Sequence, residues 1–576
     1  MAYRLEIYGG RGAGQVEVDC LGHRFRKPGP EELKEYIEFF SGIVGKNHRR
    51  LKFVVSDTLT RVEGRTYFFD RLSRYLQLLE IVESEERTVV ITNLDRTLLK
   101  ALSRQLRERG VPHRSFGPGA ASEAQRLLRF PLRVIFMLFG DIASILISAL
   151  FQARLKDAWY HSLILSFYDY RCSRDGSYVD AYFQPLIEHL IRQGRSVAVL
   201  STPITAGSPK RLLKYMRGVR KALREFEGLA KPCEVVFYYR LLRPAGVLMA
   251  YMRGLSGLIR LREKVHYSGR DITFLLSLSL FEDYLSCQWA YAWKQYYLFR
   301  RLFRAYGFDN VIYPYENHPW EKLLVTARNV SGSKARITAF QHTSISFKLL
   351  QYFPGSHERY LPFYPDRILA AGDILRDVMN EVGSYREGLV QSGCALRHDY
   401  LFGGRNAKIK KGPTWKIAYA FSFDTKVYPG VIERLAEALG GTRYTVYLKI
   451  HPLVPEQDVI RTELPANLVP AKNMRWEELF REIDILLYDD NSLGIEALKY
   501  GVEVAYFGLA DGIYNCDRLF KYERGKTVIN SVEELRSFVR DYYARAGWSE
   551  DRDEYSMRYL HSYFLPITEE RLEKFA

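Results

Sequence analysis

The stretch "TVYLKIHPLVPE", from Thr445 to Glu456, decides how the rest of the chain is interpreted. Its apolar and aromatic residues up to Ile450 are typical of a buried strand, which ends abruptly at His451-Pro452. Taken alone, this pattern fits a strand, a turn and a histidine at the surface. A functional reading needs further strands beside it, because side chains at the carboxyl ends of parallel strands converge on one edge of a sheet.

Strands and helices alternate on both sides of this stretch. The run "KIAYAFS" (416–422) precedes it, and "IDILLYDD" (483–490) and "VEVAYFG" (502–508) follow it, with helical patterns between them. Such alternation predicts a parallel sheet covered by helices. A second series of the same kind begins near residue 159; its strands are expected at 163–170, 196–202, 234–239, 310–316 and 335–342.

The first 117 residues also alternate, with strands expected at 51–57 and 87–95, and so predict a small α/β unit. The glycine-rich Gly9–Gly14 fits either a nucleotide-binding loop or a simple turn. We favour the turn, because the following residues resemble a strand and not a helix. The fold class is therefore α/β, and four segments are predicted: an accessory α/β unit (1–117), an apolar and basic segment (118–158), and two parallel-sheet domains (159–395 and 396–576).

Charge and cysteine content restrict the class of protein. The 576 residues carry a net charge of +17, yet the residues from Leu401 onward hold 25 Lys and Arg against 27 Asp and Glu, so the first 400 carry +19. This placement fits a nucleic acid, an anionic membrane or a phosphorylated substrate as partner. The six cysteines show no metal-binding spacing, so no metal site is predicted, and no signal peptide is recognised. A cytoplasmic protein is expected.

The most apolar stretch is "FPLRVIFMLFGDIASILISALF" (130–151), which has basic residues on both sides. It is long enough to cross a bilayer, but Asp141 would then lie in mid-membrane. An interfacial helix and a buried core helix are the alternatives. Because three basic amphipathic helices are also predicted, we expect a surface that faces a membrane; they lie at 208–226, 249–265 and 296–308.

A candidate anion site follows the strand at 483–490. There Asn491-Ser492 would cap a helix that starts at Leu493, and a helix start offers free N–H groups to an anion. If this strand lies near the strand that ends at His451, the imidazole, the Ser492 hydroxyl and the helix amides face one volume suited to a phosphate. Glu496, one turn along the helix, would then meet a ribose hydroxyl. Asp489-Asp490 fits a strand-end cap better than a metal-binding pair of carboxylates.

Two strands of the first large domain also end in polar residues. "YPYENHPWEKLLV" places Glu316 just before a predicted helix, and "AFQHTSIS" ends a strand at His342. A carboxylate or an imidazole at such a point can deprotonate a hydroxyl group. A helix-capping charge at Glu316 and a buried, hydrogen-bonded ring at His342 are equally good structural explanations.

Together, "KIHP" and "DDNSLGIEAL…GVEVAYFG" resemble the donor domain of GT-B glycosyltransferases and phosphotransferases that use cytidine nucleotides. These families include bacterial polysialyltransferases, the Kdo transferases of capsule and O-antigen synthesis, and CDP-glycerol glycerophosphotransferases. The resemblance covers mainly residues 310–510. The stretch at Glu316 looks like the "YENxPWE" of surface-carbohydrate biosynthesis proteins. The stretch at His342 is similar to that around the histidine base of the glycerophosphotransferases, with Gln341 in place of a tryptophan.

The resemblance implies a GT-B fold, in which two Rossmann-like domains face a cleft, and a donor site in the second of them. The resemblance implies that His451, Pro452 and Ser492 hold the nucleotide phosphate. Asn491, beside Ser492, and Ser422, at the end of its own strand, complete the predicted donor-site residues. The family often has two serines where this chain has Asn491-Ser492. Glu316 and His342 are the candidate catalytic residues, and Glu316 is favoured as the base.

The function expected from this resemblance is transfer of a sugar, most simply a CMP-linked Kdo- or sialic-acid-like sugar, to an anionic or lipid-linked acceptor. The enzyme would build a bacterial capsule or O-antigen (lipopolysaccharide) at the inner face of the cytoplasmic membrane, without a metal or another cofactor. Two alternatives stay open: a CDP-glycerol-dependent glycerophosphotransferase, and a non-catalytic protein that binds membranes or nucleic acid. No RNA-binding aromatic motif is recognised, so nucleic acid is not expected as a partner.

Overall fold

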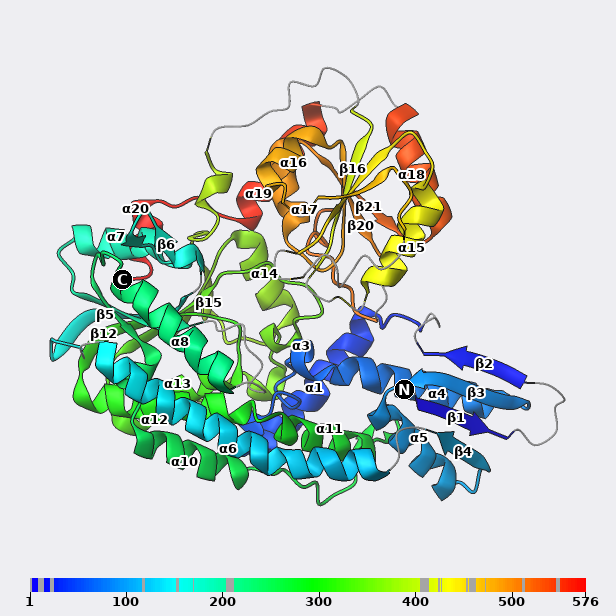
Figure 1. Cartoon of the computed structure of the whole chain (residues 1–576), viewed down its shortest axis with the longest axis horizontal. Coiled ribbons are helices and arrows are strands. Elements are labelled where there is room, and N and C mark those ends of the chain that lie inside the picture. Colours follow the sequence, from blue (N-terminus) through cyan, green and yellow to red (C-terminus); the bar gives the residue numbers. More distant parts are fainter. Residues whose placement is uncertain are drawn as a thin grey trace.

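The computed structural model describes residues 3–8, 15–20, 25–116, 120–151, 155–168, 170–203, 212–403, 414–422, 425, 427–451, 454, 463–471, 473–509, 513–544 and 550–576. Three sheets of four, seven and six strands organise these residues. In Figure 1 the six-stranded sheet lies at the top, the seven-stranded sheet at the lower left and the four-stranded sheet at the right.

The seven-stranded sheet is parallel throughout, in the order β15-β14-β13-β12-β5-β8-β9. Its central strands are nearly continuous apolar runs, as expected where helices cover both faces of a parallel sheet. Helices α12 and α13 pack against one another beside it, and α7 and α14 contact its strands. The strands are β5 (Trp159–Tyr168), β8 (Val197–Pro203), β9 (Glu234–Phe237), β12 (Gly307–Pro314), β13 (Arg336–Gln341), β14 (Arg367–Ala370) and β15 (Val390–Ser392), and the helices are α7 (Gln184–Arg192), α12 (Trp289–Ala305), α13 (Pro319–Ser331) and α14 (Asp373–Val382).

The six-stranded sheet is also parallel, in the order β18-β17-β16-β19-β20-β21. One face of it forms a core of its own with α15 and α18. Its strands are β16 (Lys416–Ala420), β17 (Thr445–Lys449), β18 (Leu468–Pro470), β19 (Ile485–Tyr488), β20 (Glu503–Phe507) and β21 (Lys526–Ile529), and its helices are α15 (Tyr428–Leu439), α16 (Trp476–Glu482), α17 (Leu493–Ala497) and α18 (Val532–Ala544).

The last helices, α19 (Glu550–Tyr563) and α20 (Glu569–Glu573), return to the seven-stranded sheet. The backbone N–H of Leu565 donates to Ala371 O at 2.8 Å, and the side chain of Asn310 donates to Phe575 O. The end of the chain thus packs on the domain that precedes the six-stranded sheet, which the sequence patterns did not indicate.

The N-terminal unit has a mixed four-stranded sheet, in the order β2-β3-β1-β4. The strand expected at 87–95 is confirmed as β3 (Thr88–Leu94), but the strand expected at 51–57 is wrong, because Leu51–Val55 forms helix α2. The run Phe53–Val55 is buried throughout and so lacks the alternation that identifies a strand. Gly9–Gly14 lies outside the described residues. The other elements are β1 (Tyr3–Ile7), β2 (Gln15–Asp19), β4 (His113–Phe116), α1 (Pro30–Asn47), α3 (Glu63–Thr66), α4 (Phe68–Ser84) and α5 (Arg96–Glu108).

Helix α6 (Ala120–Phe151) contains the apolar stretch and packs on α8 (Leu212–Glu227) and α10 (Pro244–Leu255). By length and composition, Ala124–Leu150 is a candidate membrane span, and only 28% of the apolar 18-residue window within it is buried. The face of α6 that packs on the protein carries Asp141, Ser144 and Ser148, all buried. The opposite face is apolar and exposed, at Leu128, Leu132, Ile135, Phe136, Phe139, Leu146 and Leu150. The segment is therefore not a buried core helix.

Candidate functional site

Glu316 and His342 lie side by side at the carboxyl edge of the seven-stranded sheet. They follow β12 and β13, which are adjacent parallel strands. Glu316 Oε2 accepts a hydrogen bond from His318 Nε2 at 2.8 Å, and Glu316 Oε1 lies 3.6 Å from His342 Nε2. The Glu316 side chain is 41% exposed, whereas that of His342 is 5% exposed. Of the three polar groups, the carboxylate is the one open to a substrate.

The loop that carries Glu316 is held by the first turn of α13. The buried carboxylate of Glu321 accepts hydrogen bonds from the backbone N–H groups of Glu316, Asn317 and His318. Asn317 adopts a left-handed conformation, with φ of 56°, and its side chain donates to Gln351 O at 2.6 Å. Few torsions near Glu316 are free, so its position is fixed before a substrate arrives.

Arg397 sets the tautomer of His342. Its Nη1 atom donates to His342 Nδ1 at 2.9 Å, so the ring proton of a neutral His342 must lie on Nε2, the atom that faces Glu316. Tyr182 packs edge-on against His342 and lies 4.5 Å below the Arg397 guanidinium. Burial, and then the charge of Arg397, lower the pKa of His342 to about 3. His342 is therefore a neutral hydrogen-bond donor in this arrangement and has no lone pair free to act as a base.

Glu316 is ionised across the physiological range. Burial acts to raise its pKa, but the hydrogen bond from His318 and the nearby His342 and Arg65 outweigh burial and bring the pKa to about 2. His318 is 13% exposed, and its Nδ1 atom is buried without a hydrogen-bond partner among the described residues. Glu316 is thus the only one of these three groups that is both exposed and able to accept a proton.

The residues predicted to bind the donor follow three strands of the six-stranded sheet. His451 follows β17, Ser422 follows β16 and Ser492 follows β19. The strands that precede His451 and Ser492 are near each other but not adjacent. Strand β16 lies between β17 and β19, so Ser422 follows the strand between them. Burial lowers the pKa of the half-buried His451 imidazole. Pro452 lies outside the described residues.

The start of α17 is capped as the sequence predicts, but by Asn491. Its Oδ1 atom accepts the backbone N–H of Leu493 at 3.0 Å, and its Nδ2 atom donates to Ala420 O at 2.8 Å. The Ser492 hydroxyl donates to Glu496 Oε1 at 3.2 Å, and the Tyr400 hydroxyl donates to Glu496 Oε2 at 2.8 Å. The Ser492 hydroxyl and the Glu496 carboxylate therefore lie together at this edge, and their contact with a nucleotide stays a prediction.

The two acidic residues before Asn491 have different surroundings. Burial, and then the charge of Asp490, raise the pKa of Asp489 to about 7. Burial also acts on Asp490, but Arg518 and Lys348 outweigh it and lower the pKa. Within the described ranges, no group of three or more His, Cys, Asp or Glu side chains is arranged to hold a metal ion.

Asp490 joins the two sheets directly. It binds Lys348 Nζ at 2.8 Å and Arg518 Nη2 at 2.6 Å, and Arg518 Nη1 also donates to Ser344 O, two residues after His342.

A second link runs through the segment 397–400. Arg397 holds His342, and Tyr400 holds Glu496. The two links bring the predicted catalytic and donor groups to one region between the carboxyl edges. The linking residues Arg397, Tyr400, Lys348 and Arg518 were missed in the sequence, because they lie in irregular segments that carry no strand-end signal.

No protein-family model matches this chain, and no curated protein matches it in sequence. Among solved structures, the calicheamicin glycosyltransferase CalG4 matches with a TM-score of 0.39 at 11% identity, over 70% of this chain and 94% of CalG4. The UDP-GlcNAc 2-epimerase of Methanocaldococcus jannaschii, in complex with UDP-GlcNAc and UDP, matches with a TM-score of 0.37 at 10% identity, over 70% of this chain and 99% of the epimerase. The glycotransferase of kitacinnamycin matches with a TM-score of 0.37 at 15% identity, over 71% and 95%.

Such likenesses concern the fold alone. On its own strand order, this chain is an α/β protein with two parallel sheets of seven and six strands and a small mixed N-terminal sheet. The predicted α/β class, with two parallel-sheet domains and a small N-terminal unit, is confirmed.

Proposed function

We propose that this chain is a metal-independent glycosyltransferase that moves a sugar from a nucleotide donor to an acceptor at a membrane surface. The observation that carries the proposal is the exposed Glu316 carboxylate, fixed between His318 and His342 at the carboxyl edge of one parallel sheet. Arg397 and Tyr400 connect that carboxylate to Ser492 and Glu496 at the carboxyl edge of the other sheet. A base on one side and phosphate-binding groups on the other are what glycosyl transfer requires.

In this proposal Glu316 accepts the proton of the acceptor hydroxyl. His342 donates its Nε2 proton toward Glu316 or the acceptor and so orients the base, while Arg397 keeps His342 in that tautomer. With a pKa of about 2, Glu316 is always in its reactive form but is a weak base. We therefore place its contribution near the lower end of the roughly 10²–10⁴-fold typical of general bases.

The donor side holds the leaving phosphate. His451 and Ser492, with Ser422 between their strands, offer an imidazole and two hydroxyl groups at one edge of the sheet. Asn491 fixes the start of α17, and Glu496 lies one turn on, where a ribose hydroxyl would fit. The resemblance of "KIHP" and "DDNSLGIEAL" to cytidine-nucleotide enzymes supports a CMP-linked donor.

Helix α6 supports the membrane part of the proposal. In water, a surface helix buries its apolar face and exposes its polar face. In α6 many apolar residues are exposed instead, among them Leu128 and Leu146, whereas the buried side includes the polar residues Asp141, Ser144 and Ser148 beside Val134 and Ile145. Asp141 is also paired with Lys294 inside the protein. An exposed apolar face of this kind fits a helix that lies in the membrane interface with its polar side on the protein.

The sequence resemblance extends the proposal to the pathway. The enzyme would act in the synthesis of a bacterial capsule or O-antigen, at the inner face of the cytoplasmic membrane. Its acceptor would be an anionic or lipid-linked glycan, which suits the basic first 400 residues.

The test is a comparison of nucleotides by thermal shift, followed by turnover. We expect CMP or CDP to raise the melting temperature more than UDP or GDP. Replacing His451 by Ala should weaken CMP binding by roughly 10- to 100-fold, because a charge-assisted phosphate contact is worth about 1.5–3 kcal/mol. The control is His266→Ala, an exposed histidine in β10 (His266–Tyr267) on another part of the molecule.

Each rival function gives its own result. Release of CMP from CDP-glycerol, and not from CMP-sugars, would identify a glycerophosphotransferase. Interconversion of a nucleotide sugar without transfer would identify an epimerase. Salt-sensitive RNA binding without turnover would identify a binding protein. Equal nucleotide shifts in wild type and His451→Ala would show that the donor site lies elsewhere.

A further inference from the structure

A cavity of about 720 Å³ lies at the amino edge of the seven-stranded sheet. Lys156, Asp157 and Ala158 line it just before β5, and Tyr306 lines it just before β12, the neighbouring strand. Glu316 and His342 follow the other ends of β12 and β13. The cavity is therefore separate from the proposed catalytic site, at the opposite edge of the same sheet. Its remaining lining residues are Arg243, Met249, Tyr297, Arg300, Arg301, Arg304 and Ala305, from α10, α12 and the residue before α10.

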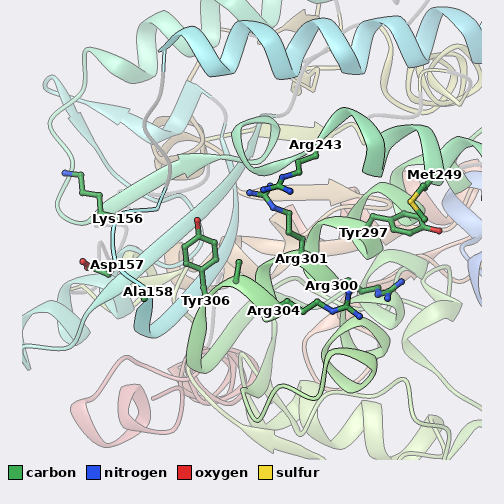
Figure 2. A pocket seen from close by; sticks show the side chains of 11 residues that line it. Lys156, Asp157, Ala158, Arg243, Met249, Tyr297, Arg300, Arg301, Arg304 and Tyr306 are labelled. Carbon is green, nitrogen blue, oxygen red and sulfur yellow. The ribbon is translucent and has the colours of Figure 1, made fainter.

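The cavity is strongly basic. Five of its lining residues are cationic, and Asp157 is the one acidic residue among them. Figure 2 shows the side chains of Arg243 and Arg301 directed toward one another from two different helical segments. Like charges at close range repel each other unless an anion lies between them, so this lining favours an anionic ligand.

Four of these five cations have no carboxylate partner among the residues that the structure describes. Within the described part of the chain, no ion pair is formed by Lys156, Arg243, Arg300 or Arg304. Arg301 donates to the carbonyl of Leu241 at 2.5 Å. The Arg300 guanidinium lies 5.4 Å from the Tyr296 ring, and its Nε atom is buried without a hydrogen-bond partner in the described residues. Several guanidinium N–H groups thus remain for a ligand, and a guanidinium matches phosphate oxygens in pairs.

The cavity borders exposed apolar residues of α10, the helix on which α6 packs. Met249, which lines it, is 49% exposed and belongs to an apolar row on α10 with Leu248, Met252 and Leu255. Helix α6 packs on α10 and ends at Phe151, five residues before Lys156. Its last turn carries Leu150, which is 82% exposed. Basic groups beside an apolar surface are the arrangement that holds a protein at the interface of an anionic membrane.

We propose that this cavity binds the phosphate headgroup of an anionic membrane lipid, while its acyl chains lie against the apolar faces of α6 and α10. The proposal rests on the membrane association in the proposed function and adds a defined headgroup site to it. A lipid bound there would orient the enzyme on the membrane and leave the carboxyl edge of the sheet free for transfer.

The test compares full-length wild type with Arg243→Gln/Arg304→Gln. The matched control is Arg481→Gln/Arg524→Gln, which removes the same charge from two exposed arginines on the six-stranded-sheet domain. Two measurements are made. The first is binding of dihexanoyl phosphatidylglycerol below its micelle concentration, against dihexanoyl phosphatidylcholine and inorganic phosphate. The second is co-sedimentation with phosphatidylcholine vesicles, with and without phosphatidylglycerol.

We expect wild type to bind the short-chain phosphatidylglycerol more tightly than phosphatidylcholine or phosphate. The cavity variant should bind the anionic lipid and the anionic vesicles about tenfold or more weakly, since each basic residue near an anionic surface contributes several-fold. The control variant should bind as wild type does, and binding of the cavity variant to pure phosphatidylcholine vesicles should be unchanged.

Three results would overturn the headgroup site: a cavity variant that binds anionic lipid as wild type does, equal binding of inorganic phosphate and phosphatidylglycerol, or wild-type vesicle binding that phosphatidylglycerol does not increase. The last of these results would still leave the proposed membrane-binding face intact. Binding of the short-chain lipid in the cavity without vesicle binding would support the headgroup site and reject the membrane part of the proposed function.

Discussion

The two edges of the seven-stranded sheet differ in how their charged side chains are paired. At the carboxyl edge, the Glu316 carboxylate contacts the imidazoles of His318 and His342. The Arg397 guanidinium donates a hydrogen bond to His342 and lies over the ring of Tyr182. At the amino edge, Arg243, just before α10, and three arginines of α12 line a cavity in which Asp157 is the one lining carboxylate. The first edge is organised before any ligand arrives, as catalysis requires, whereas the second gains its compensation from a ligand.

The largest expected effect is a loss of turnover when Glu316, at the carboxyl edge, is replaced. Glu316→Gln keeps the shape of the side chain and removes its basicity, so turnover should fall by about 10²-fold or more while nucleotide affinity stays unchanged. His342→Asn should cost less turnover, because His342 orients the base. The measurement is steady-state turnover with a CMP-sugar, beside calorimetric binding of CMP.

The control for this experiment is Glu387→Gln, an exposed carboxylate outside the site. If Glu316→Gln turned over at the wild-type rate and His342→Asn were inactive with its nucleotide affinity intact, His342 would be the base. The tautomer set by Arg397 would then have to change when substrate binds.

The sequence predicts candidate residues at the carboxyl edge but not those at the amino edge, for a physical reason. Glu316, His342, His451 and Ser492 directly follow apolar strands, so the order of the strands places them even before side-chain contacts are known. The cavity arginines lie at helix ends, where Arg300, Arg301 and Arg304 look like the solvated face of an ordinary amphipathic helix. The strand expected at 51–57 failed for a related reason, because a short, fully buried apolar run carries no periodicity.

The order of the strands in the six-stranded sheet could not be derived from the sequence either. Nothing in "TVYLKIHP" shows that β16 lies between β17 and β19, since sheet order depends on how the crossover helices pack. The same holds for Arg518 and Tyr400, whose roles arise from contacts between distant segments. Residue type and strand ends identify candidate groups, whereas tertiary packing selects their partners.

A second prediction tests the polar face that α6 turns to the protein. Asp141 Oδ1 binds Lys294 Nζ at 2.7 Å, and its Oδ2 atom accepts the Tyr251 hydroxyl at 2.7 Å, all in the interior. Asp141→Leu would leave the ammonium group buried without a partner, so the free energy of unfolding should fall by about 3–5 kcal/mol. Urea unfolding measures this loss.

The double variant Asp141→Leu/Lys294→Met provides the control. It removes both charges and should recover most of the lost stability, because an apolar pair of similar volume often replaces a buried ion pair without cost. A single Asp141→Leu variant as stable as wild type would show that α6 does not dock through this face, and the membrane-facing assignment of its apolar side would fall with it.

The smallest expected effect is a loss of stability at low pH. Protonation of an imidazole at the carboxyl edge would place cations close together there, as they already are at the amino edge. His398 stacks on the ring of Phe564 with centroids 4.0 Å apart, next to Arg397. Burial, and then the charge of Arg397 and the proximity of His342, lower the pKa of His398 to about 3. Its folded form stays neutral while the unfolded chain takes up a proton below about pH 6.5. The contribution of His398 to the free energy of unfolding is therefore fully present above pH 6.5 and is lost as the pH falls toward 3.

At pH 5 this difference corresponds to about 2 kcal/mol for one histidine, since each pH unit between the two pKa values is worth about 1.4 kcal/mol. His398→Phe keeps an aromatic ring against Phe564 and removes the titration, so the variant should lose less stability than wild type between pH 7.5 and pH 5. The same substitution at the exposed His266 is the control. Urea unfolding at the two pH values gives the comparison. If the variant and wild type lost equal stability, His398 would be accessible to protons in the folded state, and the carboxyl edge would not hold its imidazoles neutral.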